Sequence, residues 1–306
     1  MNSLVALAPE VEAALAEGRP VVALESTIIT HGLPHPRNLE IAREIEAAVR
    51  AAGATPATIA VMEGRIRVGL EDARLARLAA TPPEAVMKLS RADLAACLAL
   101  GRTGATTVAA TMICARLAGI GVFATGGIGG VHRGAAESFD VSADLHELAR
   151  TPVTVVAAGA KAILDLPKTF EMLETLGVPV IAVGQDRIPA FWSRDSGLPA
   201  PLRMDDPATI AAAARIRGRL GLEGGQLVVN PIPPEAEIPR AVMLPLIERA
   251  LAEAEAQGIA AKAVTPFLLA RILELTGGRS LEANIALVLS NARLAARIAR
   301  AMAAAG

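Results

Sequence analysis

The chain has 306 residues with 30 basic and 31 acidic side chains, so its net charge is −1. This balance lacks the basic surplus of proteins that bind nucleic acids or anionic membranes. Five Phe, one Trp and no Tyr also offer few platforms for stacking bases. Although 53% of the residues are hydrophobic, no charge-free apolar run reaches the roughly 20 residues of a membrane-spanning helix. We therefore expect neither a nucleic acid nor a membrane as a partner.

Along the chain, short β-branched runs alternate with longer helical patterns, which is typical of a mostly parallel sheet with helices on both faces. The predicted strands are residues 20–26, 57–63, 85–90, 120–126, 152–159, 178–184 and 226–232. A run at 66–68 predicts an added hairpin strand, which makes the sheet mixed. The predicted helices are 37–53, 71–79, 91–100, 104–119, 168–176 and 207–220, with three more from residue 240.

These elements predict one α/β domain over residues 1–306, built as a three-layer α/β/α arrangement. The segment from about 240 to 306 is expected to form a helical layer packed on it. The first residues, MNSLVALAPE, have no basic stretch ahead of the apolar ones, which is not typical of a secretory signal, so we expect a cytoplasmic protein. Cys97 and Cys114 are interpreted as small buried side chains, and Trp192, in a long loop at 186–207, as a packing anchor.

Polar residues follow several of the predicted strands. In doubly wound sheets, ligands bind outside the carboxyl ends of the strands. Glu25, Lys88, the glycine-rich stretch from Thr125, Lys161 and Asn230 all occupy such positions. We expect these groups to converge on one edge of the sheet.

Two of these residues have the chemistry of catalytic groups. Glu25 ends the apolar run VVALE, where a carboxyl group can act as a general acid; a helix cap or an ion pair is the alternative. Lys161 lies between VVAAGA and ILDLP with no adjacent carboxylate, so its amine can attack a carbonyl-like carbon. The alternative is a lysine whose stem lies along apolar surface while its head stays in water.

A second group of residues is suited to binding phosphate. Lys88, Ser90 and Arg91 combine ammonium, hydroxyl and guanidinium groups at a predicted helix start, an arrangement that binds anions. Ser90 as a simple N-cap is the alternative. At the next helix start, the hydroxyl of Thr107 and the backbone of Val108 can line the same cleft.

The stretch from Thr125 to Leu145 places glycines beside charged residues. Its Asp140 and Asp144 flank Ser142, and one or both carboxylates can hold a hard divalent cation. Ser142 as N-cap of a helix that begins near Ala143 is the alternative. Pro34 and Pro36 exclude the helix that would place His31 and His35 on one face as metal ligands, and so favour a structural turn. Asn284, inside a helical pattern, is by itself a solvated or core-satisfied amide.

Taken together, these segments resemble the pseudouridine-5′-phosphate glycosidase family, which includes the indigoidine-cluster A proteins. The resemblance is carried by long strings with rare residues, spread in order from residue 23 to 234 with a further SLEANIALV at 280–288. They include ALESTIITHGLPHP, GATTVAATM, TGGIGGVHRGAAESFDVSADL, PVTVVAAGAKAILD and FWSRDSG.

The resemblance implies a manganese-dependent homotrimer that reversibly cleaves pseudouridine 5′-phosphate with water, giving uracil and ribose 5-phosphate. It implies that Glu25 is the proton donor, Lys161 the nucleophile and Asp140 the ligand of Mn²⁺. It also implies substrate contacts, or other roles in the site, for Lys88, Val108, Ser142, Ala143, Asp144, His132, Asn284 and Thr107.

Two other functions remain open at this point. A class I aldolase-like lyase acting on another sugar phosphate would share the Schiff-base lysine and the phosphate contacts, but would not release uracil. A ligand-binding protein without catalytic activity is the other alternative, and the presence of Glu25, Lys161 and Asp140 argues against it.

Overall fold

The computed structural model describes residues 3–259 and 264–304 of the chain. The described residues form an 11-stranded mixed sheet with the order β1-β4-β3-β2-β7-β8-β11-β9-β10, and β6 joins β3 to β5. The strands are β1 (Val5–Leu7), β2 (Val21–Leu24), β3 (Thr55–Met62), β4 (Arg65–Val68), β5 (Met87–Leu89), β6 (Gly104–Thr106), β7 (Val122–Ala124), β8 (Thr154–Ala157), β9 (Val180–Ala182), β10 (Leu202–Arg203) and β11 (Gln226–Val229).

The predicted sheet is confirmed in its main features. Each of the seven predicted strands is present, and β4 pairs antiparallel with β3 as the predicted hairpin strand. The neighbours from β3 through β2, β7, β8, β11 and β9 are all parallel. These strands are buried along their whole length, because helices cover both faces of the sheet.

One predicted helix begins too early. The helix expected over 104–119 is α5, Val108–Leu117, and the residues before it form β6. Gly104 is closely packed, since a Cβ atom there would lie 2.4 Å from Leu89 Cδ1 and 2.8 Å from Cys97 Sγ. The strand is only three residues long, and its pairing with β3 and β5 depends on contacts distant in sequence, which local periodicity does not reveal.

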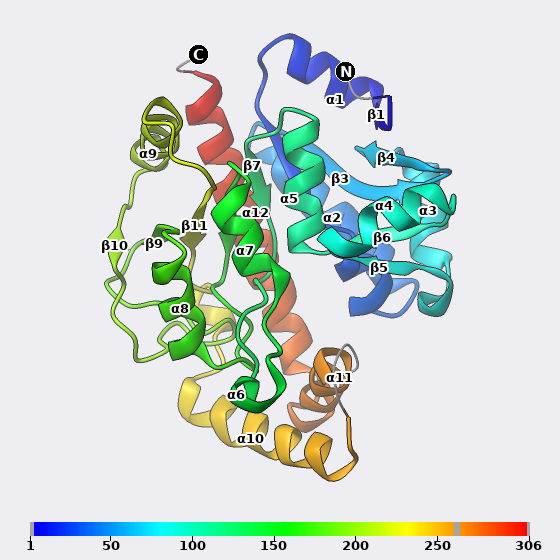
Figure 1. Ribbon diagram of the computed structural model, residues 1–306. Helices are drawn as coiled ribbons and strands as arrows, with labels where there is room; N and C mark the ends of the chain where they lie inside the picture. The colour runs from blue at the N-terminus through cyan, green and yellow to red at the C-terminus, as the bar shows by residue number, and fades with distance from the viewer. Residues whose placement is uncertain (1–2, 260–263, 305–306) are drawn as a thin grey trace.

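Helices cover the sheet from two sides (Figure 1). On one side α12 packs on β2, β7 and β8 with α2 and α9 beside it, and on the other α5 packs on β2, β3 and β7 with α7 next to it. The α-helices are α1 (Pro9–Ala16), α2 (Arg37–Ala51), α3 (Asp72–Ala80), α4 (Arg91–Ala99), α5 (Val108–Leu117), α6 (Ala135–Ser138), α7 (Ala143–Arg150), α8 (Leu166–Thr175), α9 (Pro207–Arg219), α10 (Arg240–Ala256), α11 (Val264–Leu275) and α12 (Arg279–Ala303). No helix in the described ranges has the length and apolar character needed to cross a membrane.

The expected C-terminal helices are present, and α12 is the one that covers the sheet. It runs the length of the molecule, whereas α10 and α11 pack on each other at the lower end in Figure 1. Residues 260–263 and 305–306 of this predicted segment lie outside the described residues. The interpretations of isolated residues also hold: Trp192 and both cysteines are buried, and burial raises the pKa of the Cys114 thiol to about 12.

Candidate active site

The site begins where β2 and β6 meet end to end along β3. The register pairs β2 with the first half of β3, and β6 with Ala60 and Val61 in the opposite direction. At the junction, the Ser26 hydroxyl donates to the carbonyl of Ile59 at 2.6 Å and accepts the backbone N–H of Thr106 at 2.9 Å. The residues after β2 and β6 are therefore brought together although 80 positions separate them in sequence.

Glu25 lies at this junction and is held through both carboxylate oxygens. Its Oε2 accepts a hydrogen bond from the Thr27 hydroxyl, and its Oε1 accepts one from the Thr125 hydroxyl. Thr125 directly follows β7, the neighbour of β2. The predicted position of Glu25 at the carboxyl edge of the sheet is therefore confirmed, and within the described part of the chain Glu25 forms neither a helix cap nor an ion pair.

Lys161 is positioned by the glycine-rich loop that follows β7. Beyond the ends of β7 and β8 the parallel pairing continues, as Ala158 N–H donates to Gly126 O at 2.9 Å and Lys161 N–H donates to Ile128 O at 3.1 Å. One short loop thus contacts Glu25 through Thr125 and Lys161 through Ile128. Glu25 and the backbone of Lys161 are thus attached to the same loop, because β2, β7 and β8 are adjacent parallel strands.

The glycines of this loop serve close packing within the protein. A Cβ atom at Gly127 would lie 2.6 Å from the ring of Phe191, one at Gly129 2.3 Å from Ser142 Oγ, and one at Gly130 2.4 Å from Thr169 Oγ1. These close contacts bring the loop backbone against neighbouring side chains and so fix the loop that carries Thr125.

His132 and Asp140 face each other at the base of a hairpin. The His132 N–H donates to Asp140 O at 3.0 Å, and an antiparallel bridge joins Val131 to Val141. The side-chain atoms His132 Nδ1 and Asp140 Oδ2 are 3.9 Å apart. Burial lowers the pKa of His132; the negative charge of Asp140 raises it, and the positive charge of Lys161 lowers it. His132 therefore lies within electrostatic range of both predicted functional groups.

Asp144 joins the glycine-rich loop to α5. It is 6% exposed, and its carboxylate accepts N–H groups from Ala109 at 2.9 Å and Gly129 at 2.8 Å. Ser142 is the N-cap of α7 and accepts the Asp144 N–H at 3.3 Å. The capping interpretation of Ser142 is thus confirmed, with Ala143 as the first residue of α7. This places the N-terminus of α7 beside that of α5.

Lys88 and Thr107 come to the same region along β5 and β6. Lys88 pairs in register with Ala105, and the Thr107 N–H donates to Leu89 O at 3.0 Å. Thr107 is the N-cap of α5, yet its buried hydroxyl has no hydrogen-bond partner among the described residues. A buried polar atom without a partner at a helix N-terminus is suited to a ligand that brings its own acceptor. Val108 follows as the first residue of α5 and is buried.

His31 lies close to Lys88 and was expected in a simple turn. It is part of a five-residue π-helix, Ile28–Gly32, and such segments often occur at functional sites. Its Nδ1 is 2.6 Å from the Thr30 hydroxyl. Burial, and then the positive charge of Lys88, lower the pKa of His31.

Ser90 and Arg91 make protein contacts of their own. Ser90 caps α4 in a capping box, in which its N–H donates to the Asp93 carboxylate at 3.0 Å. Arg91 forms a bidentate pair with Glu147 of α7 at 2.7 and 2.9 Å, and the Glu147 side chain is 1% exposed. The cap proposed as the alternative for Ser90 is therefore present, and Arg91 ties α4 to α7.

Asn284 projects from α12 toward the Trp192 loop. Its Oδ1 accepts the indole N–H of Trp192 at 2.6 Å, so the oxygen of this amide has a partner within the protein. Asn230, after β11, donates to Ser290 at 3.0 Å and to Asn291 at 3.0 Å, both on α12. The predicted convergence of Asn230 on the sheet edge thus serves to hold α12 there.

Around Asp140 the described residues offer few protein ligands for a hard cation. Within the described ranges no group of three His, Cys, Asp or Glu side chains is arranged to hold a metal ion. The Asp140 side chain is 38% exposed, and one carboxylate with several waters is enough for an ion such as Mn²⁺. The residues therefore fit an ion held by Asp140 and water rather than by a cage of protein ligands.

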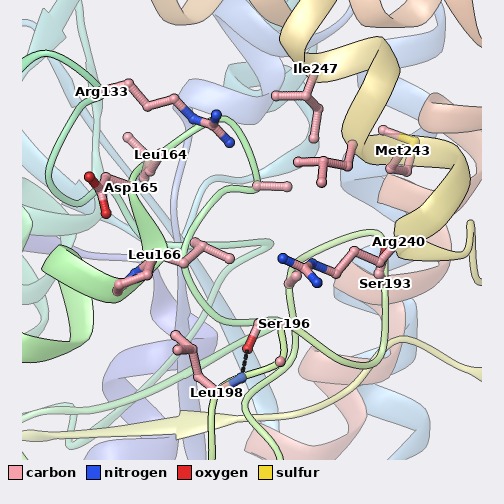
Figure 2. A pocket seen from close by; sticks show the side chains of 15 residues that line it. Arg133, Leu164, Asp165, Leu166, Ser193, Ser196, Leu198, Arg240, Met243 and Ile247 are labelled. Atoms are coloured by element: carbon pink, nitrogen blue, oxygen red, sulfur yellow. Dashed lines mark hydrogen bonds between the residues drawn. The ribbon is translucent and has the colours of Figure 1, made fainter.

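A cavity of about 580 Å³ lies next to the Lys161 loop, between α8, α10 and the segment 190–198. Figure 2 shows the side chains of Arg133 and Arg240 extending into it, with Leu164 and Ile247 on its wall. None of the predicted site residues lines it. The predicted catalytic residues Glu25 and Lys161 are therefore not part of the wall of this cavity.

Comparison with known proteins identifies the family of the chain. The sequence profile of the family described as "Indigoidine synthase A like protein" matches residues 10–301. A pseudouridine-5′-phosphate glycosidase of Paracoccus denitrificans is 79% identical over 303 residues, covering 99% of this chain and 100% of that protein. The crystal structure of the prealnumycin C-glycosynthase AlnA in complex with ribulose 5-phosphate matches with a TM-score of 0.92 and 42% identity, covering 100% of this chain and 99% of that one. An indigoidine synthase A-like protein from Thermotoga maritima matches with a TM-score of 0.86 and 36% identity, covering 94% of both chains. The chain therefore belongs to the indigoidine synthase A-like family.

Proposed function

We propose that this protein is a glycosidase that cleaves the C–C glycosidic bond of pseudouridine 5′-phosphate, and that it serves pseudouridine degradation. The observation that carries the proposal is the single loop after β7 that contacts Glu25 through Thr125 and Lys161 through Ile128. An acid–base group and an amine held at one sheet edge suit covalent catalysis at a sugar carbon. The relative at 79% identity bears the name of this activity.

The carbon–carbon bond explains the need for an amine. Direct departure of the base would leave a poorly stabilised carbanion at C5 of uracil. In the proposed reaction, Lys161 Nζ bonds to C1′ while the C1′–O4′ bond breaks and O4′ takes a proton, which opens the ribose ring. The nitrogen lone pair then forms an iminium as the C1′–C5 bond breaks, and C5 receives a proton. Water adds to the iminium, and ribose 5-phosphate leaves Lys161.

Glu25 is the proposed proton carrier for these steps. Its carboxyl group can deliver a proton to O4′ or to C5 and recover it from the attacking water. The hydroxyls of Thr27 and Thr125 hold it in one orientation. His132, close to both Lys161 and Asp140, is the further polar group available at this site.

We propose that the phosphate binds between Lys88 and the N-termini of α5 and α7. The orphaned Thr107 hydroxyl lies at the first of these helix ends, and Asp144 keeps the two ends together through Ala109. Backbone N–H groups and an ammonium group are a suitable combination for a phosphate dianion. Binding energy gained there can hold C1′ against the amine.

A manganese ion and a threefold assembly complete the proposal. Mn²⁺ would be held by Asp140 and water, and when bound it would supply positive charge to the developing negative charge of the substrate. We propose that this chain forms a homotrimer. A sedimentation experiment measures the mass of that assembly directly.

The decisive experiment mixes the pure protein and Mn²⁺ with uracil and ribose 5-phosphate. We expect a C-nucleotide, identified by its mass and ultraviolet spectrum. Folded wild-type protein that forms no such product would contradict the proposed function. The class I aldolase-like alternative is separated by the opposite reaction, since only the proposed glycosidase releases uracil from pseudouridine 5′-phosphate.

A further inference from the structure

We propose that Thr125 is a positioning residue for catalysis, whose hydroxyl orients Glu25, and that Asn291 of α12 holds Thr125 in place. This inference rests on the proposed function, because it needs Glu25 to act in the reaction. It adds two residues, Thr125 and Asn291, to the apparatus of the site.

The first argument is the way the carboxylate is held. Thr27 donates to Oε2 and Thr125 to Oε1, so the two oxygens are fixed from two different segments. One hydrogen bond leaves a carboxylate free to rotate about its last torsion, which is broad and weakly restrained. Two bonds on opposite oxygens define its plane. The lone pairs of the carboxylate then have fixed directions.

The second argument is that Thr125 is itself fixed. Thr125 is 2% exposed, and its backbone N–H donates to Val156 O of β8 at 3.0 Å. Its carbonyl accepts the Asn291 side-chain amide at 2.8 Å. The Thr125 backbone is therefore held by β8 on one side and by α12 on the other.

Asn291 lies on the buried face of α12. Its neighbours Ala292, Leu294 and Ala295 are buried among hydrophobic side chains, whereas Asn291 is fully buried with partners for its amide. Its Oδ1 accepts from Asn230 Nδ2 at 3.0 Å. Burying an amide in such a helix costs free energy unless its hydrogen bonds are made. These bonds run from Asn230 after β11 through Asn291 to Thr125 and end at Glu25.

A threonine-to-valine exchange tests the hydroxyl while keeping the side-chain shape. We expect Thr125→Val to lower kcat by about 10- to 100-fold, as expected for a misplaced catalytic group, with KM for ribose 5-phosphate within about twofold of wild type. Thr125→Ser keeps the hydroxyl and should restore kcat to within about threefold. A structural defect alone would change KM as well as kcat. It would also persist in Thr125→Ser, because serine is smaller than threonine.

Thr27→Val provides the second variant if Thr125→Val does not fold, because Thr27 is only half-buried and holds the other oxygen. We expect the same loss of kcat at constant KM. Unchanged kcat in the folded valine variants, alongside an inactive Glu25→Gln, would overturn this inference and leave the proposed function intact. A loss of kcat in Thr125→Ser equal to that in Thr125→Val would overturn it as well, since the hydroxyl would then not be the cause. An inactive wild type would overturn both the proposed function and this inference.

Discussion

Ser26 Oγ accepts the backbone N–H of Thr106 at 2.9 Å, and this bond joins the end of β2 to the end of β6. The same hydroxyl donates to Ile59 O at 2.6 Å, so both strand ends are fastened to the middle of β3. Glu25 and Thr107 each lie one residue from this pair. The bond therefore joins the acid–base half of the proposed site to its phosphate-binding half.

Ser26→Ala should leave the buried Thr106 N–H without this partner. We expect the free energy of unfolding to fall by about 1–3 kcal/mol, the usual cost of an unsatisfied buried polar group. Denaturant unfolding measures this, and Thr209→Ala, at an exposed residue of α9, should change the value by less than about 0.5 kcal/mol. Equal stability of the two variants would show that the junction does not depend on Ser26.

Asp144→Asn should loosen the connection between the glycine-rich loop and α5. Both carboxylate oxygens accept N–H groups, whereas an amide offers one acceptor and one donor, which would face an N–H donor. We expect a loss of about 1.5–3 kcal/mol in unfolding free energy, together with a higher KM for ribose 5-phosphate. An unchanged KM would argue that the α5 N-terminus does not bind the phosphate.

Gly129→Ala should destabilise the protein, because the added methyl group has no room. The added methyl group would lie 2.3 Å from Ser142 Oγ and 2.9 Å from Asp144 Oδ2. We expect the unfolding free energy to fall by about 1–3 kcal/mol, as for other overpacked sites. The matched control is Gly218→Ala, in α9 with no atom within 4 Å of the new methyl, which should stabilise the helix by about 0.5–1 kcal/mol. A Gly129 variant as stable as the control would show that the loop is loosely packed.

His31 should report phosphate binding at Lys88. Burial, and then the charge of Lys88, lower the pKa of His31, so His31 is neutral at pH 7. A phosphate dianion beside Lys88 offsets its positive charge, and we expect ribose 5-phosphate to raise the pKa of His31 in an NMR titration. In Lys88→Met, the pKa should already be higher without ligand, and ribose 5-phosphate should raise it no further. A ligand that binds without moving the His31 titration would place the phosphate elsewhere.

The sheet could be predicted from the sequence to a large extent, because its parallel strands are continuous apolar runs between helical patterns. The run VVALE ends at Glu25 and VVAAGA ends just before Lys161. These strand ends correctly predicted that both residues lie at the carboxyl edge of the sheet. The strands β1, β6 and β10 escaped prediction. Of these, β6 owes its existence to contacts with β3 and β5. Only three residues long, it carries no periodicity of its own.

The supporting residues of the site were harder to predict. Thr27 and Thr125 are ordinary threonines in the sequence. Thr27 contacts Glu25 from two residues away, and only the adjacency of β2 and β7 shows that Thr125 contacts it too. Asn291 carried a weak signal, as an amide within an alanine-rich helical pattern, but its partner Thr125 is 166 residues away. The family resemblance is confirmed by the comparisons. The metal at Asp140, the trimer, the single domain and the cytoplasmic location stay predictions.

The most direct test of the account follows the bond between Lys161 and the sugar. The protein is mixed with pseudouridine 5′-phosphate and borohydride, and the peptides are then mapped by mass spectrometry. For the wild type we expect released uracil together with a reduced ribose 5-phosphate adduct on Lys161. Lys161→Ala should give neither product. The control Lys168→Ala, at an exposed lysine of α8, should behave as wild type. Release of uracil by the wild type with no adduct on Lys161, or with undiminished turnover in Lys161→Ala, would contradict the covalent mechanism.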